Sequence, residues 1–192
     1  MRTYAGRGVG AYFANDLFTA SEYIYVVSRW ISPDHANRLV AKAKEGVEVK
    51  VLTSDDNERN HQQALRILTE ALRPPRLIML RRSSWQPPNM ELGVIREEYL
   101  HVKMYVWDDK MAVVGSANFT HRGLWDNIEH IVVFDDPREV EMIKNDFHTL
   151  WHLYTEHKEA AREVITLEDI AKKIGKTVRD LASLFSRLRS KS

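Results

Sequence analysis

Two cationic side chains lie two positions apart at the start of a mainly apolar segment. The segment reads "HVKMYVWDDKMAVVGSANF" and opens with His101 and Lys103. Residues two apart share one face of a β-strand, so we expect both side chains to point the same way. A histidine can act as nucleophile or general acid, and a lysine beside it stabilises negative charge that develops on a phosphoryl group. The pair therefore suits phosphoryl chemistry.

More polar residues follow after a turn. Asp108 and Asp109 predict the turn of a hairpin, and Ser116 and Asn118 then share one face of the returning strand. An isolated His-x-Lys pair most often belongs to an exposed sheet edge, but here six positions have fixed spacing. A chance match of this kind is expected on the order of 10⁻⁶ times in a chain of this length. The six positions are His101, Lys103, Asp108, Gly115, Ser116 and Asn118.

This spacing resembles the HxKxxxxD signature and GSxN extension of the phospholipase D superfamily. The similarity extends from about Ala20 to about His157, through strand and helix segments like those around the motif in that superfamily. Its members form a phosphohistidine on one motif histidine, protonate the leaving group with a second, and use no metal. The resemblance implies a metal-independent phosphodiesterase without a cofactor. In the superfamily an acidic residue after the motif supports the catalytic histidine, and Glu129 stands in the matching place.

The chain contains one such motif, as do small members of the superfamily, many of them endonucleases, that pair as homodimers. A twofold interface brings two copies of one surface together, so both His101 side chains could face one phosphorus atom. The resemblance therefore implies a homodimeric endonuclease that cleaves nucleic acid, with DNA as the expected substrate. The candidate catalytic residues are His101, Lys103, Asp108, Ser116, Asn118 and Glu129.

The resemblance also implies a role for each candidate. His101 is the nucleophile in one subunit and the acid/base in the other, and Lys103 holds the non-bridging oxygens. Ser116 and Asn118 donate hydrogen bonds to the same phosphate, and Glu129 orients an imidazole. The turn position of Asp108 favours a structural partner over a chemical one. Gly115 is expected to let backbone and phosphate approach closely.

Composition limits the class of protein. The chain has 192 residues, no cysteine and a net charge of +1. The lack of cysteine excludes disulfides and thiolate metal sites, and any anionic partner must be met by a local patch. His148, His152 and Glu156 share one helix face, but we expect a solvated face there and no metal site. We also expect no stable membrane association and a cytoplasmic protein.

Alternating strand and helix patterns predict the fold class. Strands are expected over 22–31, 47–54, 76–82, 100–107, 110–119 and 129–136, and helices over 33–46, 58–73, 120–125 and 137–157. Residues 83–98 read as a long loop. The "GRGVG" start reads as a flexible entry. Such alternation implies an α/β fold, a mostly parallel mixed sheet flanked by helices, with a small C-terminal helical element. We expect a phospholipase D-like catalytic domain over 1–160.

Residues 161–192 resemble a helix-turn-helix. Thr166 and Thr177 are expected to begin two amphipathic helices that meet at Gly175. From Lys158 onward the chain has nine basic and five acidic residues, 9 − 5 = +4, which favours contact with nucleic acid. A helical hairpin that packs on the core or completes the dimer is the alternative. The candidate DNA-binding residues here and near the expected loop are Arg81, Arg82, Trp85, Arg96, Lys172, Lys173, Lys176, Arg179, Arg187 and Arg189.

Two other functions remain open at this stage. The same chemistry could act on a phospholipid, as a phospholipase or phosphatidyltransferase. The chain could also be a non-catalytic DNA-binding protein, although every motif position is intact.

Overall fold

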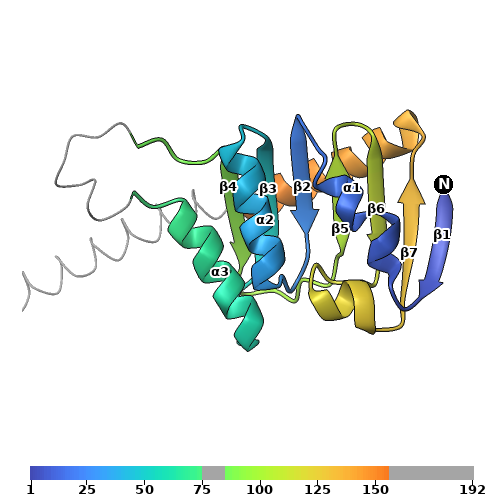
Figure 1. Cartoon of the computed structure of the whole chain (residues 1–192), viewed down its shortest axis with the longest axis horizontal. Helices are drawn as coiled ribbons and strands as arrows, with labels where there is room; N and C mark the ends of the chain where they lie inside the picture. The colour runs from blue at the N-terminus through green and yellow to red at the C-terminus, as the bar shows by residue number, and fades with distance from the viewer. Residues whose placement is uncertain (75–84, 156–192) are drawn as a thin grey trace, which may run out of the picture. The chain divides into compact units, whose positions relative to one another are not determined.

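A computed structural model describes residues 1–74 and 85–155. Met1–Trp151 form one compact unit, and its centre is a mixed seven-stranded sheet in the order β1-β7-β6-β5-β2-β3-β4 (Figure 1). The strands are β1 (Arg2–Gly6), β2 (Tyr23–Val27), β3 (Glu48–Ser54), β4 (Met90–Ile95), β5 (Met104–Trp107), β6 (Met111–Gly115) and β7 (Glu129–Phe134). The helices are η1 (Val9–Tyr12), α1 (Ala14–Leu17), α2 (Pro33–Lys44), α3 (Arg59–Ala71) and η2 (Arg122–Asp126). Residues 137–155 are also helical.

The expected α/β fold with a mixed sheet between helices is confirmed, but the sheet is not mostly parallel. Only β2, β3 and β4 pair in parallel, and the other four pairings are antiparallel. Parallel neighbours need a crossover, which α2 and α3 provide. β5, β6 and β7 pair as antiparallel neighbours, which need no crossover helix. β5 and β6 form the expected hairpin.

Two strands were not expected from the sequence. β4 lies inside the segment 83–98, which the sequence analysis interpreted as a loop. That interpretation arose because prolines and an asparagine precede β4 and its own residues alternate only partly between apolar and polar types. β1 lies before the "GRGVG" stretch, shares only Gly6 with it, and pairs with β7 at the edge of the sheet. The expected strand 76–82 and the helix-turn-helix 161–192 lie outside the described residues.

The two faces of the sheet are covered by different helices. Figure 1 shows α2 and α3 in front of the sheet and the helix that begins at residue 137 behind it. β2 is buried along its whole length, as a strand covered on both faces must be. Ile24 and Val26 join the core beneath α2, while the ring of Tyr25 stacks on Phe147 with 4.6 Å between centroids. The sheet is therefore rigid where its strands end.

The hairpin between β5 and β6 anchors the start of β2. Asp108 and Asp109 both have positive φ, 51° and 49°, and form the centre of a turn that the Lys110 N–H closes by donating to the Trp107 carbonyl at 3.0 Å. The Asp108 carboxylate accepts hydrogen bonds from the backbone N–H groups of Ser21, Glu22 and Tyr23 at 2.7, 2.9 and 2.9 Å. Burial raises the pKa of Asp108, but these donors outweigh burial and hold the pKa below its usual range.

Asp108→Asn should lower the free energy of unfolding by about 2 kcal/mol, because an amide cannot replace a carboxylate that accepts three N–H groups. Urea unfolding at neutral pH measures this change. Asp126→Asn is the matched control, since Asp126 is exposed and is expected to change stability by less than about 0.5 kcal/mol. Equal stability of the Asp108 variant and the wild type would contradict the anchoring role.

Candidate active site

The strand ends that flank the motif meet at one edge of the sheet. The register pairs Val27 with Met104, Met104 with Val114 and Gly115 with Ile131. The segments that follow β2, precede β5, follow β6 and precede β7 are therefore neighbours. His101, Lys103, Ser116, Asn118 and Glu129 all belong to these segments, so the structure brings five of the six candidates to one edge.

Lys103 is a buried cation at this edge. Its side chain is only 4% exposed, and its Nζ donates to the backbone carbonyl of His101 at 2.8 Å. Burial lowers the pKa of Lys103, the negative charge of Glu129 opposes that effect, and Arg29 adds to it. A phosphate beside Lys103 would supply the counter-charge that the ammonium lacks.

His101 lies at the surface, unlike Lys103. The two residues precede β5 in irregular backbone, so the shared strand face expected for them is replaced by a contact through the His101 carbonyl. The His101 ring stacks on Tyr99, with 5.7 Å between centroids and 16° between planes. The guanidinium of Arg29 lies 4.0 Å from the centre of the Tyr99 ring and pairs with Asp56 at 2.6 Å. A chain of packed groups thus supports the imidazole.

The sequence did not predict this support. Tyr99 belongs to an acidic stretch, and Arg29 and Asp56 follow strands that are distant in the chain. Only the sheet order brings the three side chains together. The position of Tyr99, two residues before the motif histidine, was the one feature of the sequence that could have suggested a contact with the imidazole.

Glu129, the first residue of β7, is held by side chains that follow β6 and precede β7. Its Oε2 accepts a hydrogen bond from Ser116 Oγ, and its Oε1 accepts one from Asn127 Nδ2 at 3.1 Å. Ser116 Oγ also accepts from the backbone N–H of His130 at 3.0 Å. Within the described part of the chain, Glu129 makes no hydrogen bond to His101, so its role in orienting an imidazole stays a prediction.

A set of hydrogen bonds joins the end of β2 to the segment after β6, and we name it the β2–β6 junction. The Oγ of the buried Ser28 accepts from the Phe119 N–H at 2.9 Å and lies 3.4 Å from Asn118 Oδ1. Ser32 N–H donates to the Phe119 carbonyl at 3.0 Å, and Tyr105 OH donates to the Ala117 carbonyl at 2.6 Å. The junction places Asn118 beside the end of β2, across the end of β5.

Two glycines are required by close backbone approach. A Cβ at Gly115 would lie 2.3 Å from the carbonyl oxygen of His130 on β7. The tight contact at Gly115 is therefore with β7, whereas the sequence suggested contact with a phosphate. A Cβ at Gly123 would lie 2.4 Å from the carbonyl oxygen of Asn118. Both glycines let neighbouring backbone fix the residues of the site.

Asp108 does not belong to this site. The length of β5 separates it from Lys103, and it lies at the other end of the sheet with its carboxylate on the start of β2. Its place among the catalytic candidates was wrong, while the expected structural role at the turn is what the structure shows. The fixed spacing reflects the geometry of the hairpin, because β5 and its turn must fill the positions between Lys103 and Asp108.

The structure separates the candidate DNA-binding residues. Arg96 follows β4 at the same edge as the site and donates to Asp55 Oδ2 at 3.1 Å. Trp85 lies near Gly46 and Asn89, at the opposite end of the sheet. The remaining candidates lie outside the described residues: Arg81, Arg82, Lys172, Lys173, Lys176, Arg179, Arg187 and Arg189.

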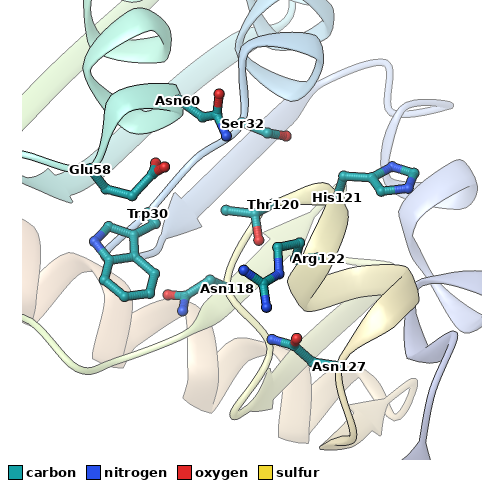
Figure 2. Close-up of a pocket in the computed structure, with 9 residues that line it drawn as sticks. All are labelled: Trp30, Ser32, Glu58, Asn60, Asn118, Thr120, His121, Arg122 and Asn127. Atoms are coloured by element: carbon teal, nitrogen blue, oxygen red, sulfur yellow. The ribbon is translucent and has the colours of Figure 1, made fainter.

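A pocket of about 270 Å³ opens beside Asn118. Nine residues line it: Trp30, Ser32, Glu58, Asn60, Asn118, Thr120, His121, Arg122 and Asn127 (Figure 2). They come from the ends of β2 and β6, the start of α3 and the segment before β7. Of these nine residues, Asn118 alone is among the catalytic candidates that the sequence suggested.

Neither metal ligands nor a membrane span is found in residues 1–74 and 85–155. No group of three or more His, Cys, Asp or Glu side chains there could hold a metal ion. Glu156, the third residue of the histidine stripe, lies outside these ranges. Among the same residues, no helix combines the length and apolar character needed to cross a membrane.

A comparison with known protein families supports the resemblance that the motif suggested. A family model described as cardiolipin synthase, PLD-like domain, matches residues 14–151. The chain belongs to the phospholipase D superfamily. The resemblance that the motif suggested is therefore confirmed over most of this phospholipase D-like chain.

Individual relatives of this phospholipase D-like chain are distant. The mitochondrial cardiolipin hydrolase of Canis lupus familiaris is 24% identical over 128 residues, which cover 66% of this chain and 44% of the relative. The chain thus spans less than half the length of that protein. Nuc from Salmonella typhimurium, a phospholipase D family member, superposes with a TM-score of 0.60 at 19% identity, covering 79% of this chain and 94% of Nuc. NucT from Helicobacter pylori gives a TM-score of 0.55 at 18% identity, covering 77% and 92%. These structures share the fold.

Proposed function

We propose that the protein is a metal-independent phosphodiesterase that cleaves nucleic acid through a phosphohistidine on His101. The observation that carries the proposal is the convergence of an exposed imidazole, a buried ammonium and the polar groups of Ser116 and Asn118 at one sheet edge. Within the described residues, no hydrogen bond uses the side-chain nitrogen of Asn118, which leaves it available to a phosphate oxygen. The single O–H of Ser116 is donated to Glu129, so Lys103 and Asn118 are the groups that would donate to developing charge on a phosphate here.

The reaction would proceed in two displacements. The His101 imidazole attacks phosphorus, a P–N bond forms, and the P–O bond to the leaving group breaks. The leaving oxygen takes a proton from the partner subunit's His101. Water then attacks the phosphohistidine, gives its proton to that second imidazole, and the P–N bond breaks. Lys103 would hold the non-bridging oxygens throughout, without itself changing its protonation state.

A twofold dimer would supply the second imidazole. Each chain has one motif, and His101 is exposed, so it can reach a phosphate shared with another copy. Two large apolar side chains flank the motif at the surface, Tyr99 at 72% and Ile128 at 78% exposure. Exposed apolar side chains beside a site suit a surface that is covered by a partner subunit.

Nucleic acid is the preferred substrate for two reasons. The compact fold resembles Nuc along nearly all of the Nuc chain, and eight of the nine residues that line the pocket beside Asn118 are of polar or charged types. A phospholipid is the second candidate. The name of the curated relative and the description of the matching family model favour it, since both refer to cardiolipin, a phosphodiester lipid.

One comparison of substrates tests the proposal. Purified protein with excess EDTA should cleave plasmid DNA and single-stranded oligonucleotides and leave cardiolipin vesicles intact. His101→Ala should lower the rate by about 10³-fold or more, because nucleophile and acid disappear together. His130→Ala is the matched control. The His130 side chain is exposed on β7, and the variant should retain the wild-type rate.

Three results would contradict the proposal. Hydrolysis of cardiolipin with intact nucleic acid would establish the lipid reading in its place. A strict requirement for added magnesium would exclude the two-histidine mechanism. An active monomer, shown by light scattering at the assay concentration, would exclude the shared site.

Sulfate binding should reveal the lowered pKa of Lys103. Sulfate keeps its charge across the basic range, and a His101→Asn background removes the titration of that imidazole. Since burial lowers the pKa of Lys103 from 10.5, sulfate affinity should fall at a pH below 10.5, where an ordinary lysine is still charged. In Lys103→Arg the loss should move to higher pH, because arginine stays protonated. Identical pH profiles of the two proteins would show that Lys103 does not hold the anion.

A further inference from the structure

The pocket beside Asn118 has two chemically different walls. In Figure 2 the Trp30 ring and the Arg122 guanidinium lie on either side of Asn118, and Glu58 lies above Trp30. Arg122 is exposed and makes no ion pair among the described residues. An anion held by Asn118 would therefore lie close to the positive charge of Arg122. The Trp30 ring and the Glu58 carboxylate would face the chemical group that carries this anion.

The wall that carries Trp30 is held in place by its neighbours. The Arg29 guanidinium lies 5.1 Å from the centre of the Trp30 ring and is itself fixed by Asp56. The Trp30 carbonyl accepts a hydrogen bond from Ser28 Oγ at 2.7 Å. The indole is thus positioned by the same serine that reaches Asn118, so the aromatic surface and the phosphate site keep a fixed relation.

The Glu58 carboxylate is also positioned in advance. Its Oε2 accepts from the N–H of His61 at 2.7 Å and caps the start of α3. The His61 ring is fully buried, with Nδ1 accepting from the Ile31 N–H at 3.1 Å and Nε2 donating to the Ser54 carbonyl at 2.7 Å. No hydrogen bond among the described residues engages Glu58 Oε1, which leaves it as an acceptor for a ligand.

We propose that this pocket binds one unpaired nucleobase of the substrate, next to the phosphate that is cleaved. The inference rests on the nucleic-acid function proposed above. Trp30 offers a stacking surface, and Glu58 Oε1 can accept from the exocyclic amino group that adenine, cytosine and guanine carry and thymine lacks. Arg122 would contact the phosphate that links this nucleotide to the chain. A base that is paired within a duplex cannot enter, so the pocket selects single-stranded or locally opened nucleic acid.

Dinucleotides with a single phosphodiester bond provide the test. One member of each pair has a normal base on both sides of the phosphate, and the other has an abasic sugar on one side. For the wild type, removal of the base on one side should lower kcat/KM by about tenfold. A dinucleotide with thymine on that side should be cleaved several-fold more slowly than one with adenine.

Trp30→Ala should lower kcat/KM for the normal dinucleotide to that of the abasic one, and Trp30→Phe should restore most of it. Glu58→Gln should remove the preference over thymine while its amide oxygen still caps α3.

Tyr12→Ala is the matched control, because Tyr12 is a half-exposed aromatic residue of η1 that does not line the pocket, and its loss should change the rate on neither substrate. Equal loss on normal and abasic dinucleotides in Trp30→Ala would show a merely structural role and overturn the base pocket. Equal rates of the wild type on both substrates would overturn it as well. A wild type that cleaves cardiolipin but no dinucleotide would instead refute the nucleic-acid function, and the base pocket with it.

Discussion

The hydrogen bonds of Ser28 at the end of β2 determine how the candidate site is assembled. In the sheet, β5 lies between β2 and β6, so the segment after β6 must cross the end of β5 to reach β2. Ser28 Oγ receives the Phe119 N–H at 2.9 Å and donates to the Trp30 carbonyl at 2.7 Å. One buried hydroxyl therefore fixes the backbone beside Asn118 and the backbone that carries the pocket wall. The strand register brings the polar groups of the motif to one edge, and Ser28 fixes the segment of Asn118 against the segment of Trp30.

The buried charge of Lys103 is the second determinant. An ammonium that is 4% exposed is costly unless a counter-charge is present, and among the described residues the His101 carbonyl and the negative charge of Glu129 offset this cost. Proteins retain such groups where function needs them. An anion beside Lys103 would offset this cost, and Asp108 anchors the other end of β5 to the start of β2.

The sequence predicted those parts of the fold whose pattern is local. The β5–β6 hairpin followed from alternating apolar residues around Asp108 and Asp109, and the motif spacing identified five residues that do lie together. β4 was missed because prolines and asparagine beside it favour a loop, and the antiparallel majority was missed because pairing partners are not encoded in periodicity. The stacking of Tyr99 on His101 and the pocket wall at Trp30 depend on contacts between segments distant in the chain. Such contacts follow from the strand order, which no single segment reveals.

The stereochemistry at phosphorus tests the phosphohistidine most directly. A dinucleotide whose phosphodiester is a phosphorothioate of one configuration would be hydrolysed in ¹⁸O-labelled water, and the configuration of the product determined. Two successive in-line displacements, first by His101 and then by water, predict net retention of configuration. Net inversion would show that water attacks the phosphodiester directly, and it would contradict the proposed role of His101 as nucleophile.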